Sequence, residues 1–176
     1  MKPFDSDAKF LGETLLKAIK SLPNFTQKNL FKIMEEVGIP NLAADAWYPI
    51  QPLDTFYQQI EEKFGPNTLF DMGKAIPENA RFPPGIDTIE AGLQLTDMAY
   101  NMNHRGYVGF HKFLSHDVDN KKIIIHSYTP YPADFDRGMF TTIARGFKTG
   151  VKVIIDENRE YEKQNEKERW YLITYR

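Results

Sequence analysis

The residues of this chain best suited to chemistry are its four histidines, since cysteine is absent. His104 stands in His104-Arg105-Gly106, where a helical pattern gives way to a strand pattern. Neutral imidazole is a common protein ligand of iron, so His104 is a candidate axial ligand or ligand contact. A histidine and an arginine at this point can instead satisfy free carbonyls at the end of a helix, which is the alternative reading.

The other histidines are His111, His116 and His126, and they lack the paired spacing of a zinc-binding helix. His111 and His126 fall on two strands that we expect to be neighbours, where they can face each other. Such a pair could form a weak site, but the spacing favours ordinary cross-strand pairing. We therefore predict no metal site.

A second polar group, Asp134, Asp136 and Arg137, lies at the expected start of a helix. Asp134 there is a candidate N-cap residue. An acid and base pair would need two carboxyl groups with separated pKa values in a cleft, which spacing alone does not indicate. Nucleotide-binding glycine loops and the Gly-x-Ser-x-Gly elbow are both absent from the sequence. We expect a binding module rather than an enzyme, with catalysis by Asp134 or Asp136 and a histidine as an open alternative.

Aromatic side chains with polar tips are suited to lining an apolar pocket, and the candidates are Trp47, Tyr48, Tyr100, Tyr107, Tyr128 and Tyr131. A pocket shared by Tyr100, Tyr107 and Tyr128 would join the central helix to the following hairpin. The predicted ligand contacts are Tyr100, His104, Arg105, Tyr107, His126, Tyr128 and Tyr131.

The composition limits the class of protein. The chain has 176 residues, 41% of them hydrophobic, and a formal net charge of -2, which predicts one domain over residues 1–176 and disfavours nucleic acid as a partner. The lack of cysteine and of any long apolar run predicts a cytoplasmic location without membrane insertion.

Apolar residues recur at three- and four-residue intervals through the first half, as in amphipathic helices. Expected helices cover 7–20, 26–37, 52–64, 66–76 and 87–102, with a capping box at Asp87 and Glu90 and a proline-rich loop at 77–85. Expected strands cover 107–114, 123–128, 151–155 and 170–175, around a helix at 135–148. The predicted fold class is α+β, with an N-terminal helical layer (about 1–105) packed on a C-terminal antiparallel sheet (about 106–176) in ββαββ order.

The order of elements over residues 123–175, behind a helical first half, resembles one superfamily. It groups 4-vinyl-reductase-like small-molecule-binding domains, heme nitric-oxide-binding domains and Bet3-type subunits of the Golgi transport particle. The resemblance rests on the strand Ile124-Ile125-His126-Ser127-Tyr128 and on the turn and helix that follow it. It implies a ligand cavity between the helical layer and the sheet, a regulatory role and a homodimer.

The sequence also departs from these relatives. The heme-binding members carry Tyr-x-Ser-x-Arg before the turn to grip the porphyrin carboxylates, where this chain reads His126-Ser127-Tyr128-Thr129-Pro130. The 4-vinyl-reductase-like members have cysteines in the turn that holds Tyr131 here. We therefore expect a non-catalytic sensor for a small apolar or aromatic molecule, with a signalling protein as partner. The alternatives are a heme-binding gas sensor using His104 and a protein-interaction scaffold resembling the transport-particle subunits.

Overall fold

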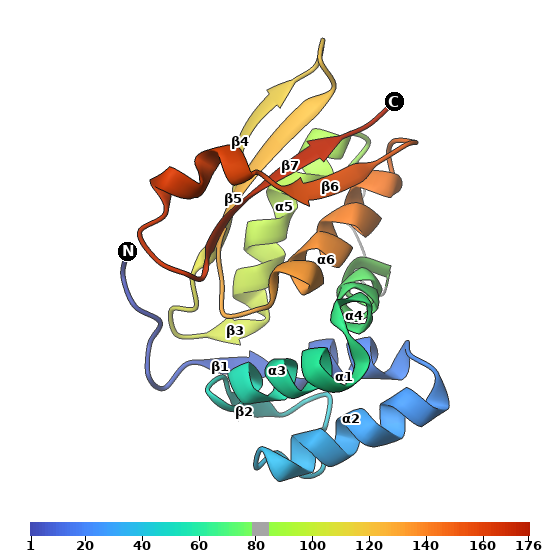
Figure 1. The fold of residues 1–176 in the computed structure, drawn as a ribbon, viewed down its shortest axis with the longest axis vertical. Helices are drawn as coiled ribbons and strands as arrows, with labels where there is room; N and C mark the ends of the chain where they lie inside the picture. The colour runs from blue at the N-terminus through green and yellow to red at the C-terminus, as the bar shows by residue number, and fades with distance from the viewer. Residues whose placement is uncertain (79–84) are drawn as a thin grey trace.

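The computed structural model describes residues 1–78 and 85–176, except for the side chains of residues 78, 160 and 161. It confirms the α+β class: helices fill most of the first half, and the second half forms an antiparallel sheet in ββαββ order (Figure 1). Helix α4 continues through Pro77 to Glu78, so the loop predicted at 77–85 starts later, and residues 79–84 lie outside the described residues.

The helices begin and end at the residues that favour such ends. They are α1 (Gly12–Lys20), α2 (Asn24–Glu36), α3 (Pro52–Phe64), α4 (Pro66–Glu78) and α5 (Ile89–Met102). Proline opens α3 and α4, since its fixed φ suits a first helical turn. The capping box predicted at Asp87 and Glu90 is wrong, because Thr88 caps α5 by accepting a hydrogen bond from the Ala91 N–H. Among the described helices, none is long and apolar enough to cross a membrane.

The larger sheet contains β4 (Phe110–Asp117), β5 (Lys122–Tyr128), β6 (Lys152–Ile155) and β7 (Glu168–Thr174), in the order β4-β5-β7-β6. One face carries buried side chains such as Ile125 and Tyr171, which pack against α5 and α6 (Ala133–Arg145). Because α6 begins at Ala133 with Pro132 as N-cap residue, the N-cap predicted at Asp134 is wrong. Asp134 instead forms an ion pair with Arg137 in the first turn.

A second, small sheet of order β2-β1-β3 was not predicted. It consists of β1 (Lys9–Leu11), β2 (Trp47–Pro49) and β3 (His104–Arg105). Phe10 pairs with both Tyr48 and His104, so residues 9–11 form a strand although their apolar spacing suits a helix. Pairing to two partners supplies hydrogen bonds that an isolated helical turn would lack. This sheet fixes His104 beside the N-terminal segment.

Helices α4 and α6 pack backbone against backbone where each carries a glycine: Gly73 of α4 faces the Phe135 carbonyl group, and Gly138 of α6 faces the Phe70 carbonyl group. Substituting Gly138→Ala should lower the free energy of unfolding by about 1–3 kcal/mol, since the new methyl group would overlap the carbonyl oxygen of Phe70. Gly146→Ala is the matched control, because Gly146 has a helical φ of -62° and a methyl group there would come no closer than 3.2 Å to a neighbouring atom, the Ile143 carbonyl oxygen. Urea denaturation of both variants checks this, and equal midpoints would contradict it.

Candidate functional site

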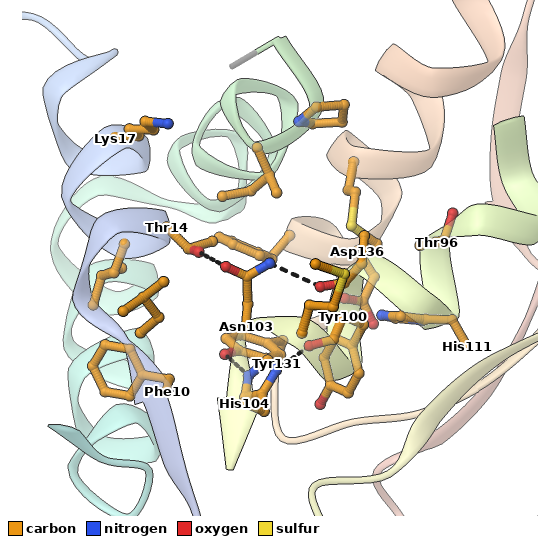
Figure 2. A pocket seen from close by; sticks show the side chains of 18 of the residues that line it. Phe10, Thr14, Lys17, Thr96, Tyr100, Asn103, His104, His111, Tyr131 and Asp136 are labelled. Atoms are coloured by element: carbon orange, nitrogen blue, oxygen red, sulfur yellow. Dashed lines mark hydrogen bonds between the residues drawn. The ribbon is translucent and has the colours of Figure 1, made fainter. Parts of the chain in front are cut away.

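A cavity of about 470 Å³, with the exposed Met98 and Met102 in its wall, lies among α1, α3, α4, α5 and α6. Figure 2 shows Thr14 and Lys17 of α1 on one side and His111 and Asp136 on the other. The volume lies in the range of roughly 300–1,000 Å³ common for small-molecule sites. The cavity is bounded mainly by helices, and among the described residues the larger sheet contributes His111 alone to its lining.

His104 lies in the cavity wall with both ring nitrogens engaged. Its Nδ1 is 2.6 Å from the Tyr100 carbonyl oxygen, and its Nε2 is 2.6 Å from the Tyr131 hydroxyl. A carbonyl oxygen only accepts, so Nδ1 carries the proton and Nε2 accepts from Tyr131. Burial lowers the pKa of His104 to about 4, so the ring is neutral at neutral pH. His104 thus satisfies a free carbonyl oxygen at the end of α5, which was the alternative to ligand binding. Its other ring nitrogen, Nε2, lies on the cavity side (Figure 2).

Tyr100 and Tyr131 complete the part of the predicted site that the structure brings together. The Tyr100 hydroxyl donates to the Val108 carbonyl oxygen at 2.7 Å. The Tyr100 and Tyr131 rings meet edge to face, with centroids 6.1 Å apart. Burial raises the pKa of both hydroxyls, so they stay protonated and can donate.

Three other predicted contacts lie outside the cavity lining. The Arg105 guanidinium stacks on Trp47 at 4.1 Å in the small sheet. The Tyr107 ring lies under the Lys2 ammonium, 4.5 Å from it. Tyr128 stacks on Phe4 with centroids 4.5 Å apart. Tyr107 and Tyr128 therefore meet the N-terminal segment, while Tyr100 alone of the proposed trio lines the cavity.

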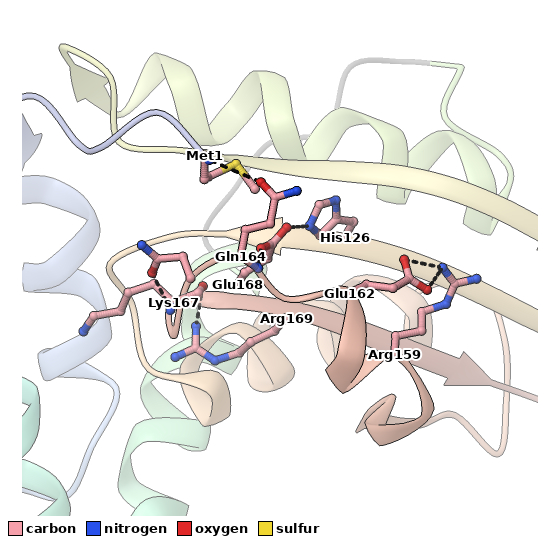
Figure 3. Close-up of polar contacts among 9 residues, drawn as sticks. Met1, His126, Arg159, Glu162, Gln164, Lys167, Glu168 and Arg169 are labelled. Carbon is pink, nitrogen blue, oxygen red and sulfur yellow. Dashed lines mark hydrogen bonds and ion pairs between the residues drawn. The ribbon is translucent and has the colours of Figure 1, made fainter.

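His126 also lies away from the cavity, on the opposite face of the sheet. Its Nε2 is 2.7 Å from Glu168 Oε1, and its ring stacks on Trp170 with centroids 4.3 Å apart. Glu168 also accepts from the Gln164 N–H, and Gln164 accepts from the amino group of Met1 (Figure 3). The link at 156–169 contains the 3-10 helix η1 (Glu157–Glu162).

Asp136 is the main cavity residue that the sequence did not assign to the ligand. It is 1% exposed, and its Oδ2 accepts from the hydroxyls of Thr129 at 3.0 Å and Tyr171 at 3.3 Å. Burial raises the pKa of Asp136 to about 7, against the opposing effects of Arg169 and of these two hydrogen bonds. The carboxyl can therefore be neutral or ionised near physiological pH. The sequence did place Asp136 in a polar group at the start of a helix, but it did not indicate that this side chain would be buried.

Two further lining residues have polar atoms without partners. The Nδ1 of His111 lies 2.8 Å from Ser127 Oγ, while its Nε2 and the Thr96 Oγ1 are buried and make no hydrogen bond to any described residue. Burial lowers the pKa of His111 to about 3, so this ring is neutral as well. Unsatisfied buried polar atoms are uncommon in native proteins and often mark a site that is completed by another molecule. Within the described residues, no group of three acidic or histidine side chains could hold a metal ion.

The hydrogen bond between Tyr131 and His104 should contribute measurably to stability. Substituting Tyr131→Phe leaves the buried Nε2 without a donor, and we expect a loss of about 1–3 kcal/mol in the free energy of unfolding. Tyr57→Phe is the control, since Tyr57 lines the same cavity and no described residue bonds its hydroxyl. Thermal denaturation should show a clearly larger drop for the first variant. Equal drops would mean that the Tyr131–His104 bond contributes nothing.

Comparison with known proteins finds no matching family model and no matching curated protein. Solved structures do match over nearly the whole chain. A point variant of the Tt H-NOX domain is 13% identical with a TM-score of 0.65, covering 94% of this chain and 95% of that one. A mutant H-NOX protein from K. algicida, described as unliganded Fe(II), is 10% identical with a TM-score of 0.68, covering 94% and 96%.

A third structure is an oxygen-binding H-NOX domain related to soluble guanylate cyclases. It is 12% identical with a TM-score of 0.61, covering 94% of this chain and 95% of that one. These matches support the heme nitric-oxide-binding part of the resemblance, while its 4-vinyl-reductase-like and Bet3-type parts stay predictions. At such low identity the likeness concerns the backbone arrangement, and by that measure this chain has the H-NOX fold.

Proposed function

We propose that this chain is a sensor domain that binds a small, largely apolar or aromatic molecule in the cavity between α1, α5 and α6. The observation that carries the proposal is a cavity of about 470 Å³ whose lining combines apolar side chains with the unpartnered polar atoms of Thr96 and His111. Ligand sites commonly pair an apolar wall with a few polar groups that fix orientation.

A ligand in this position could be sensed through the contacts that join the two halves of the chain. The His104–Tyr131 bond connects the small sheet to the turn before α6, and Thr14 of α1 bonds Asn103 at the end of α5. A ligand changes such an arrangement only if it binds two states with different affinity. Transmission to a signalling protein, a homodimer and a cytoplasmic setting remain part of this proposal.

Binding can be tested with small neutral aromatic compounds by native mass spectrometry and thermal denaturation. A ligand present at about a hundred times its Kd should raise the free energy of unfolding by about 2.7 kcal/mol. The variant Thr96→Phe places a large side chain in the cavity wall and should abolish that increase. If no compound binds the wild-type protein, or if Thr96→Phe binds equally well, the cavity is not the ligand site.

Heme is the second candidate ligand, because the fold neighbours are H-NOX domains. The residues fit an axial ligand in part: His104 donates Nδ1–H to a backbone carbonyl, which orients metal-binding imidazoles, but its Nε2 accepts from the Tyr131 hydroxyl, so this hydrogen bond would have to break before Nε2 could hold iron. Of the described lining residues, Lys17 alone is cationic, and it pairs with Glu13 at 2.8 Å, so the two porphyrin carboxylates would have one basic partner at the rim. A bound heme would supply an iron able to take a diatomic gas.

A visible spectrum of protein produced with heme supplied distinguishes the two candidates. Heme held by His104 should give a Soret band that His104→Ala removes and His116→Ala leaves intact, since His116 bonds Tyr175 away from the cavity. Absence of the band from the wild-type protein would exclude heme. The proposal of a small organic ligand would then stand alone.

A further inference from the structure

We infer that the ligand of this cavity is an organic cation, an amine or ammonium group on a small apolar body, with the Asp136 carboxylate as its counter-ion. The inference rests on the proposed function, since it names the ligand class for that same cavity. Three features carry it: an unused carboxylate oxygen, a set of aromatic walls and the charges of the surrounding side chains.

The Asp136 carboxyl group is only half satisfied by the protein. Both of its hydrogen bonds, from Thr129 and Tyr171, reach Oδ2. No described residue donates to Oδ1, although the side chain is 1% exposed and lines the cavity. An oxygen to which no described residue donates can accept a hydrogen bond from a donor group on a ligand.

Aromatic rings surround the space beside this carboxyl group. Tyr131 and Phe135 stack with centroids 5.3 Å apart, and Tyr57 lies 5.6 Å from Phe135 and 5.8 Å from Tyr131. Tyr100 meets Tyr131 edge to face on the α5 side. All four rings line the cavity, and aromatic faces attract cations. An ammonium group next to Asp136 could therefore contact both a carboxylate and π faces.

The charges around Asp136 favour a cation over an anion. The ionisable groups that face it from the packed elements are Arg169 and Tyr171 of β7, Tyr57 of α3, Tyr100 of α5, Tyr131 of the turn, and more distantly His104 and His111. The tyrosines and histidines are neutral at neutral pH, since burial raises or lowers their pKa values accordingly. Arg169 lines the outer groove on the other side of Tyr131, where it donates to the carbonyl oxygens of Tyr131 and Lys167. The other described lining groups able to carry charge at neutral pH are Lys17 and Glu13 of α1, which pair with each other at 2.8 Å, so Asp136 is the acid of this cavity without a charged partner in its lining.

Binding of a cation should be coupled to loss of a proton. Burial raises the pKa of Asp136 to about 7, so the carboxyl group is largely protonated below that pH and must ionise to hold an ammonium. Affinity for the cation should then rise about tenfold per pH unit up to about pH 7 and level off above it. A neutral ligand that accepts a hydrogen bond from the protonated carboxyl would show the opposite trend.

Calorimetric titration with 2-phenylethylamine and the matched neutral 2-phenylethanol, from about pH 5 to about pH 8, tests the inference directly. The amine should bind more tightly than the alcohol above pH 7, with the pH dependence described. Asp136→Asn should weaken the amine at least tenfold and leave the alcohol unchanged. Asp134→Asn is the control, since that carboxylate pairs with Arg137 and does not line the cavity, and it should bind both compounds as the wild type does.

The outcomes separate this inference from the proposed function. Equal or tighter binding of the alcohol, a flat pH profile for the amine, or unchanged amine binding by Asp136→Asn would overturn the cationic ligand class while leaving the cavity as a ligand site. The cationic ligand class would also be overturned if neither the amine nor the alcohol binds while some other neutral compound binds the wild type and not Thr96→Phe. Failure of every compound tested, heme included, would overturn the proposed function itself. Circular dichroism of each variant confirms that lost binding is not lost folding.

Discussion

Acidification should destabilise this protein through a histidine that stays neutral in the fold. Between pH 6.5 and about pH 4, the wild-type free energy of unfolding should fall by about 1 kcal/mol per pH unit on average, and His111→Gln should make the profile nearly flat. Burial lowers the pKa of His111 from 6.5 to about 3. In this pH range the unfolded chain therefore binds a proton at His111 and the folded state does not. The unfolded state therefore gains stability as the pH falls.

Two other buried groups set the size of that slope. His104 acts in the same direction, because burial lowers its pKa from 6.5 to about 4. Asp136 acts in the opposite direction, because its folded pKa of about 7 exceeds the ordinary value of 3.8 and the folded state holds the extra proton. Two histidines against one carboxyl leave a net difference of about one proton, and removing His111 leaves about none.

Urea denaturation at several pH values between 4 and 7 measures this slope, and the pH dependence rather than the absolute stability is the readout. His116→Gln serves as control, since that ring bonds the Tyr175 hydroxyl in a different part of the molecule. It should keep the wild-type slope. If His111→Gln retains the full slope, His111 is not held neutral by its surroundings.

The elements of the fold that sequence reasoning found are those with strong local signals. Helices α3 to α6 were predicted from the prolines at 52 and 66 and from apolar spacing. In these helices the local sequence preference and the packing in the fold favour the same structure. The small sheet escaped prediction because β1 has three residues and depends on pairing with Tyr48 and His104, which are remote in sequence. Pairing across such distances leaves no periodic trace.

The site was found in part for a similar reason. Tyr100 and His104 were predicted near a change from helix to strand, and Tyr131 was predicted as an aromatic residue in the turn before a helix; the three do meet at the cavity. His126 and Tyr128 were expected beside them, yet the outer face of β5 is covered by the N-terminal segment and by the link after β6. The outer face of that strand is half-buried at Ile124 and His126 and buried at Tyr128, and apolar residues stand on both faces, so alternation of residue types did not indicate which face borders the helices.

The buried carboxyl group should produce the other large pH effect. Relative to the wild type, Asp136→Asn should gain about 4 kcal/mol in the free energy of unfolding between about pH 4 and about pH 8, whatever offset the substitution brings at low pH. The reason is that the folded wild type must either keep the proton up to about pH 7 or bury a charge, while the unfolded chain ionises near 3.8. The asparagine can still accept the hydrogen bonds of Thr129 and Tyr171 through its amide oxygen, and it has no proton to lose.

Denaturation curves of the wild type, Asp136→Asn and Asp134→Asn over this pH range measure the gain. The curve of Asp134→Asn should run parallel to that of the wild type, because Asp134 lies in the outer first turn of α6, paired with Arg137. Parallel curves for Asp136→Asn as well would show that Asp136 titrates like an exposed carboxyl group. Such a group could not release a proton on binding a cation near neutral pH, so this one measurement on the empty protein also bears on how the cavity would select its ligand.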